Sequence, residues 1–465
     1  MKKIILFGLY ILLLGIICCA PMGNSPAWNG QEANNSKDQY EIMADSILKG
    51  KLYLDVEVDE KLKNLVNPYD PQSRVSNGVS YRWDTAYYNG HYYMYFGVLP
   101  TFMFFIPFKL ITGRSLVGYH ATQAYVFLII IGFFLFFRFL RKCFFPKMGE
   151  IAFFLLTTAS IFSTVWYFVE APALYCTAIS GAVCMIVWSL YFYFRAVFDE
   201  FSFKQRIIYA TCGALFGALA FSCRPTVAMA NVVAIPLFIV FLKKNKIELS
   251  SAYRIIPIFI PYLVIGFLIM TYNYLRFENP FDFGQSYNLT VYDMTQYTSV
   301  FNVKLVDLLN FFNNILFSSN GFNEEFPYLD FGGVLFEFPI YFIGVGLLVL
   351  NVQLARQLKK ENLLGAICML LAASVMIIIS MAATTPVIYE RYHTDIYFCY
   401  AILSFLTIGN LYSLDYNNKV LEIIISTLAI YTIISSGLYY MVPNDLNYTE
   451  YYPEVLDHIR QVLNG

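Results

Sequence analysis

Acidic and basic side chains are concentrated in residues 34–55, directly after the first long apolar run of the chain. Within them, the sequence Ser-Lys-Asp-Gln fits a capping box, with Ser36 as N-cap and Gln39 reaching back from the third helical position. Apolar residues then recur at helical spacing and predict an amphipathic helix over 37–49 that lies on a membrane surface. The carboxylate of Asp38 has two interpretations: it complements the helix dipole, or it acts as a catalytic base.

Arginines stand at the ends of three other apolar runs, at Arg224, Arg276 and Arg391. A charge at the end of a membrane span is costly unless it is paired or used, which favours a functional role. The alternatives are structural. Glu390 or Asp395 could form a salt bridge with an arginine, and Arg276 could extend to lipid headgroups.

An aromatic stretch over 86–96 contains Asn-Gly at 89–90, a pattern typical of a type I′ β-hairpin. Its tyrosines could stack on a sugar or anchor the loop among lipid headgroups. Asp84 stands just before this stretch, beside Trp83. His91 is a lone histidine without a partner in the sequence, and we expect no metal or base function from it.

The composition identifies the class of protein that must position these side chains. The chain has 465 residues, of which 58% are hydrophobic and 14% charged, and its mean hydropathy is +0.55. This leaves too little polar surface for a water-soluble protein of this size, so we predict an all-α polytopic membrane protein. The net charge of -1 gives no indication of a nucleic-acid partner. Nine cysteines are present, mostly within apolar runs, and their spacing indicates neither disulfides nor zinc.

The apolar segments predict about eleven transmembrane helices. The first, up to Cys19, could be a cleaved signal peptide, but we favour a retained anchor with a cytoplasmic N-terminus. Ten further segments approach the roughly 20 residues that cross a bilayer. They are 116–137, 151–169, 172–194, 207–223, 226–242, 255–275, 332–352, 363–383, 396–413 and 420–441.

One more apolar segment, 93–112, contains two prolines and decides the orientation of everything after it. If it does not cross, four successive loops rich in Lys and Arg face the cytoplasm, in agreement with the positive-inside rule. If it crosses, all four lie outside. We therefore predict a re-entrant or interfacial helix. The polar segments, which are 21–92, 276–331, 384–395 and 442–465, then all lie at the extracytoplasmic face of the plasma membrane.

Several short motifs, in this order, resemble those of GT-C glycosyltransferases, the class that includes protein O-mannosyltransferases and lipid A aminoarabinose transferases. The resemblance extends over nearly the whole chain, through scattered motifs. They are "KDQYEIMADSILKG", "YFGVLPTFMFFIPFKLITG", "YFVEAPALY", "FSCRPTVAM", "YNYLRFENPFDFG" and "ERYHTDIYF".

The resemblance implies a GT-C-like bundle whose extracytoplasmic loops carry juxtamembrane helices. The expected parts are a first helix (1–20), a first loop with helices at 37–49 and 93–112 (21–115), a six-helix module (116–275), a second loop (276–331), four C-terminal helices (332–441) and a tail (442–465). The implied activity is transfer of a sugar from a polyprenyl-phosphate donor to an extracytoplasmic glycan, lipid or protein. The tail has no room for a large extra domain.

The resemblance also suggests roles for single residues. Asp38 matches the acidic position of the first loop and would be the base or would orient the acceptor, and Glu170 matches a second acidic position. Arg224, Arg391 and Arg276 would bind the departing phosphate. We expect Asp84, Tyr40 and Tyr392 to contact substrate as well.

Metal dependence is open at this point. Some members of the class place a divalent cation with paired acids in the first loop, but here Asp38 is followed by Gln39-Tyr40 and the nearest acid is Glu41. A divalent cation is therefore a weak expectation.

Two other functions remain compatible with the sequence. A transporter or flippase of lipid-linked sugars could also have many spans and charged external turns. Transporters more often carry polar residues at mid-membrane, whereas here the acids and arginines gather at one face. A non-catalytic membrane scaffold would use the loops for recognition alone.

Overall fold

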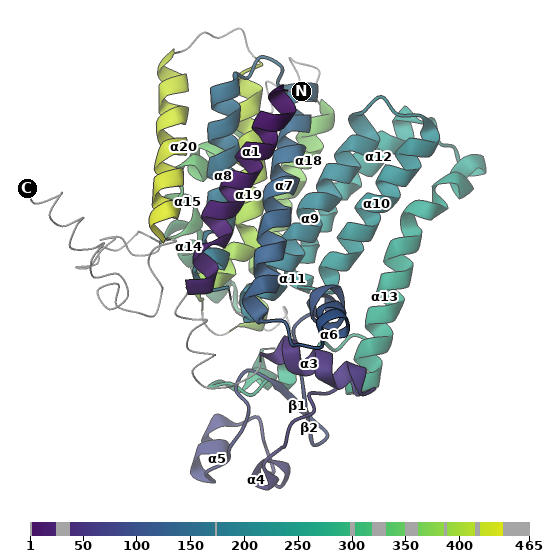
Figure 1. The fold of residues 1–465 in the computed structure, drawn as a ribbon, viewed down its shortest axis with the longest axis vertical. Coiled ribbons are helices and arrows are strands. Elements are labelled where there is room, and N and C mark those ends of the chain that lie inside the picture. Colours follow the sequence, from purple (N-terminus) through teal and green to yellow (C-terminus); the bar gives the residue numbers. More distant parts are fainter. Residues whose placement is uncertain are drawn as a thin grey trace, which may run out of the picture.

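The computed structural model describes residues 2–24, 38–172, 174–297, 303–318, 332–348, 361–385, 388–413 and 419–439. It shows a bundle of long helices with a small layer of loops, short helices and one hairpin at one end (Figure 1). The long helices are α1 (Lys2–Cys19), α7 (Gly118–Phe144), α8 (Glu150–Glu170), α9 (Leu174–Phe198), α10 (Phe203–Phe221), α12 (Ala234–Lys244), α13 (Ile256–Phe277), α18 (Glu361–Thr384), α19 (Glu390–Leu411) and α20 (Lys419–Tyr439).

Eight helices of the described chain are long and apolar enough to cross a membrane. They are 118–144, 150–170, 174–198, 225–244, 249–277, 363–384, 390–411 and 419–439. Helical spans are expected, because a helix satisfies its backbone hydrogen bonds within itself in a solvent without water. The prediction of a polytopic all-α protein is thus confirmed. Both α1 and α10 also run along the bundle (Figure 1), but neither is among these eight.

The predicted span 332–352 is described only as far as residue 348. There it forms two short helices, α15 (Val334–Glu337) and α16 (Pro339–Gly346), which follow α14 (Leu305–Phe317). The predicted number of eleven spans therefore stays a prediction.

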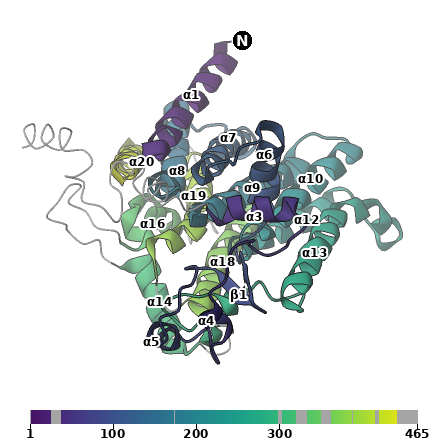
Figure 2. The same cartoon turned by 60° about the horizontal axis from the view of Figure 1, so that its bottom comes forward.

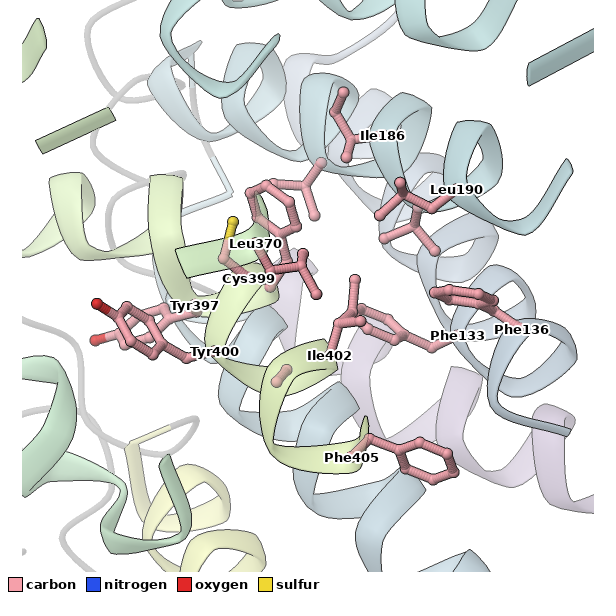
Figure 3. Close-up of a cluster of buried hydrophobic side chains, with 14 of the residues drawn as sticks. Phe133, Phe136, Ile186, Leu190, Leu370, Tyr397, Cys399, Tyr400, Ile402 and Phe405 are labelled. Atoms are coloured by element: carbon pink, nitrogen blue, oxygen red, sulfur yellow. The ribbon is translucent and has the colours of Figure 1, made fainter. Parts of the chain in front are cut away.

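The core of the bundle surrounds α19, whose membrane window is buried along its whole length. Its side chains interlock with those of α7, α9 and α18 (Figure 3). Phe405 stacks on Phe137 of α7, with ring centroids 3.9 Å apart. Such close packing is the main attraction between helices in a bilayer, where lipid tails are as apolar as the side chains. By contrast, α13 is exposed along most of its length and lies at the edge.

The layer at the bundle end combines the two large loops. The first contributes α3 (Gln39–Leu48), α4 (Glu60–Lys63), α5 (Pro71–Ser76) and the hairpin of β1 (Ala86–Tyr88) and β2 (His91–Tyr93). The hairpin turns at Asn89 and Gly90, both with positive φ, which confirms the predicted type I′ pattern. The second loop packs against it: Leu289 N–H donates to Thr85 O at 3.1 Å. In Figure 2 this layer comes forward across the helix ends.

The proline-containing segment 93–112 is helical only from residue 99 onward. A π-helical stretch, η2 (Thr101–Phe105), continues into α6 (Ile106–Thr112). Together they are shorter than the roughly 20 residues that a crossing requires, and α6 lies across the bundle end beside α3 (Figure 1). This arrangement agrees with the predicted interfacial helix.

Candidate functional site

A cavity of about 240 Å³ lies where the loop layer meets the bundle. Three arginines of the described chain line it, each from a different element: Arg224 between α10 and α11 (Pro225–Ala228), Arg276 in the last turn of α13, and Arg391 in the first turn of α19. No Asp or Glu is among its lining residues. The sequence predicted these arginines as a set, and the fold brings them to one cavity.

Arg224 forms a buried ion pair with Asp395. Its Nε donates to the two carboxylate oxygens at 2.8 and 2.9 Å, and its Nη2 lies 2.8 Å from Oδ2. Asp395 is completely buried, so the pair is shielded from water. The sequence left two interpretations of Arg224, a phosphate ligand and a partner in a structural salt bridge. The salt bridge is observed, and the side chain also lines the cavity.

Arg276 connects α13 to the loop layer. It donates from Nη1 to Met94 O at 2.7 Å and from Nη2 to Asn273 Oδ1 at 2.8 Å, and its guanidinium lies 3.8 Å from the centre of the Tyr272 ring. Only 4% of the residue is exposed. The alternative that this side chain extends to lipid headgroups is therefore wrong, because its donors point inward.

Arg391 has no carboxylate partner within 4 Å among the described residues, and the anticipated pairing with Glu390 is not formed. Its guanidinium lies over the rings of Tyr175 and Tyr389, 4.3 and 4.4 Å from their centres, with Tyr392 at 5.3 Å. Aromatic faces attract a cation without neutralising it. No carboxylate among the described residues compensates the charge of Arg391 or of Arg276, but two donors of Arg276 are already used by Met94 O and Asn273 Oδ1. The charge of Arg391 thus remains available to an anion.

Asp38 is the N-cap of α3. Its Oδ1 accepts from Tyr40 N–H at 2.9 Å. The helix begins at Gln39, so Asp38 precedes the first turn that we expected it to occupy, and the predicted cap Ser36 lies outside the described residues. Asp38 is 7% exposed, and its Oδ2 accepts no hydrogen bond from the described chain. Burial raises its pKa to about 6, against the opposing effects of the Tyr40 N–H and the Arg82 charge.

Asp38 does not line the cavity, but its neighbours reach the cavity wall. The Tyr40 hydroxyl donates to Gly97 O at 3.3 Å, and Gly97 lines the cavity. The Tyr40 ring is buried in the loop layer, stacked on Phe105. The first turn of α3 is therefore fixed to the wall, and Tyr40 contacts the wall from behind rather than from inside.

Asp84 accepts hydrogen bonds from three side chains, and the sequence did not indicate these contacts. Its Oδ1 accepts from the Tyr95 hydroxyl at 3.2 Å and from Asn288, and its Oδ2 accepts from the Tyr175 hydroxyl. Both tyrosines line the cavity, whereas Asp84 does not. It holds the wall in place instead of facing the cavity as a substrate contact.

Of the two remaining predicted site residues, one lines the cavity and the other does not. Tyr392 lines the cavity next to Arg391. Glu170 ends α8, is 5% exposed and does not line the cavity. The described residues contain no group of three or more His, Cys, Asp or Glu that could hold a metal ion. A divalent cation stays an untested expectation.

Sequence reasoning missed Tyr175, which lines the cavity, and Asn288, which donates to Asp84 behind the cavity wall. Tyr95 belongs to the aromatic stretch 86–96, for which sugar stacking was one of two expectations. Tyr175 stands in one of the motifs that carry the resemblance, "YFVEAPALY", and was available as a signal. Asn288 was not, because its partner is 204 residues away along the chain.

No protein-family model and no curated protein matches the chain. Among solved structures, it is similar to ArnT from Cupriavidus metallidurans bound to undecaprenyl phosphate. The sequence identity is 12% and the TM-score 0.41, over 83% of this chain and 71% of the other. We draw no functional argument from this similarity.

Proposed function

We propose that this chain is a membrane glycosyltransferase that moves a sugar from a polyprenyl-phosphate donor to an extracytoplasmic acceptor. The observation that carries the proposal is the cavity with three arginines and no acid in its lining, at the bundle end that meets the loop layer. A lipid phosphate that departs with negative charge needs such cations in a site of low dielectric. The motifs that resemble GT-C glycosyltransferases support the same chemistry.

In this proposal Arg391 is the principal phosphate ligand, because its guanidinium lies over tyrosine rings without a carboxylate partner among the described residues, whereas two donors of Arg276 are held by Met94 O and Asn273 Oδ1. Arg276 lends its positive charge from the cavity wall. Arg224 contributes less, since Asp395 compensates its charge.

Asp38 would accept the proton of the acceptor hydroxyl, or orient that hydroxyl. The oxygen of the acceptor hydroxyl then bonds to the sugar carbon, and the bond from that carbon to the donor phosphate breaks. The Oδ2 atom, which accepts no hydrogen bond from the described chain, is the one suited to this role. The sugar of the donor must then extend from the arginines past Gly97 toward α3. The acceptor is a cell-envelope glycan, lipid or protein.

Arg391→Gln tests the proposal, with Arg114→Gln as the matched control. Arg114 is exposed and remote from the lining residues. At equal membrane abundance, we expect cells with Arg391→Gln to lose the surface glycan and to accumulate the lipid-linked sugar on the outer face, where a membrane-impermeant oxidant can reach it. The control should match the wild type.

The competing functions give other results. If the chain is a flippase, the lipid-linked sugar accumulates on the inner face, protected from the oxidant. If the chain is a scaffold without catalysis, neither the glycan nor the lipid-linked sugar changes with Arg391→Gln. Either result would refute the proposed transfer.

A further inference from the structure

A second cleft, of about 550 Å³, lies at the opposite end of the bundle from the three-arginine cavity. It is formed by α1, α7, α8 and α9, whose ends at this side appear at the top of Figure 1 near the N-terminus. The distribution of Lys and Arg assigns this end to the cytoplasmic face. The proposed glycosyl transfer makes no use of it.

One face of α7 supplies both the apolar wall and the charge of this cleft. Leu135, Arg138, Phe139 and Lys142 line it and recur three or four residues apart, so they share one side of the helix. Phe7 of α1 adds a further aromatic surface, whereas Phe153 of α8 is 1% exposed and lies under the Arg141 guanidinium. A molecule in the cleft would therefore meet apolar side chains and two cations at once.

Two other cations of the cleft are already neutralised. Arg141 Nη1 lies 2.7 Å from Glu150 Oε2, and Arg195 Nη2 lies 2.6 Å from Asp199 Oδ2. These pairs add no net charge to the lining.

Arg138 and Lys142 are different, because neither has a carboxylate within 4 Å in the part of the chain that the structure describes. The Arg138 guanidinium lies 4.5 Å from the centre of the Phe7 ring, an interaction that leaves its charge intact. Both side chains are exposed at the mouth of the cleft. The cleft therefore carries two uncompensated positive charges above an apolar wall.

We propose that this cleft binds the headgroup phosphate of an anionic phospholipid, with an acyl chain along the wall formed by Phe7, Leu135 and Phe139. Basic pockets between helices on the cytoplasmic side suit anionic headgroups, because each nearby Lys or Arg attracts the headgroup charge. The apolar wall favours a lipid over a soluble phosphate. The lipid would join the end of α1 to α7 and α8.

The test measures lipid retention by the purified full chain, using native mass spectrometry after exchange into detergent with phosphatidylglycerol or phosphatidylcholine. We expect the wild type to retain phosphatidylglycerol selectively. In Arg138→Gln with Lys142→Gln, the affinity should fall by about thirtyfold, the effect of two cations near an anionic headgroup. The exchange Arg138→Lys with Lys142→Arg should restore retention.

The matched control is Lys204→Gln with Lys243→Gln, which removes two exposed cations at the same end of the bundle but outside the cleft. It should retain the lipid as the wild type does. The proposal is overturned if the control loses as much affinity as the cleft variant, if the cleft variant keeps its affinity, or if the wild type retains phosphatidylcholine equally well. Glycerol phosphate that competes as strongly as the lipid would also overturn it.

Discussion

At the scale of single residues, Asp38 caps α3, and an asparagine can separate this role from the proposed catalytic one. Asparagine caps a helix about as well as aspartate, so Asp38→Asn keeps the cap of α3 and removes only the carboxylate. We expect sugar transfer to fall about a hundredfold or more, with little change in melting temperature. Asp70→Asn is the control, because Asp70 caps α5 in the same way. Full transfer by Asp38→Asn would leave Asp38 as a cap alone.

The raised pKa of Asp38 predicts how transfer depends on pH. A base acts in its deprotonated form, and burial moves the pKa of this carboxyl to about 6. The rate should therefore rise with pH up to about 6 and level off above it. We would measure kcat/KM across this range in the wild type and in Asp38→Asn. The residual activity of the variant should lack the rise, and a rise of the same shape in both would assign it to another group.

The sequence predicted that the three arginines and Tyr392 belong to the site, and they line one cavity, but it did not predict what each one contacts there. Arg224 was expected either to bind phosphate or to pair, and the decision depends on Asp395, which is 171 residues away. Glu390 is adjacent to Arg391, yet neighbours in a helix point in different directions, and Arg391 lies on tyrosines instead. Local spacing thus limits the partners of a side chain, while the tertiary contacts select one.

At the scale of elements, the pair between Arg224 and Asp395 fastens the turn before α11 to α19. Removing one partner of a buried pair leaves the other charge uncompensated. Asp395→Asn should therefore destabilise the protein by about 3 to 5 kcal/mol. Unfolding in increasing denaturant measures this, with Asp55→Asn as the control.

The control removes an acid that pairs with Lys49 and Lys51 at the surface, and it should have little effect on stability, because solvent screens surface ion pairs. The double variant Arg224→Gln with Asp395→Asn should lose less stability than the sum of the two single changes. Additive losses would mean that the two side chains do not depend on each other.

The long helices and the hairpin followed from local pattern, because each depends on residues close in the chain. Runs of apolar residues predicted the spans, and Asn-Gly at 89–90 predicted the turn between β1 and β2. The contact between the two large loops could not be predicted from local pattern. Asp84 takes Asn288 as a donor from the second loop, and no periodicity connects segments so distant. The cavity wall depends on this contact, and Asn288 was missed because its partner Asp84 is so distant in the chain.

At the scale of the whole molecule, the three-arginine cavity and the basic cleft lie at opposite ends of one bundle. The positive-inside rule predicts how this bundle is oriented: the cavity and the loop layer would face out, and the basic cleft would face in. The orientation depends on segment 93–112, since a crossing there would invert every later helix. Its short helix at the bundle end favours the orientation in which it does not cross.

Reporters fused after residues 113 and 147 test this orientation in intact cells. Residue 113 follows α6 at the loop-layer end, and residue 147 lies between α7 and α8 at the other end. We expect a reporter active only outside to work at 113, and one active only inside to work at 147. The reversed result would mean that 93–112 crosses, that the three-arginine cavity faces the cytoplasm, and that transfer to an extracytoplasmic acceptor is impossible at this site.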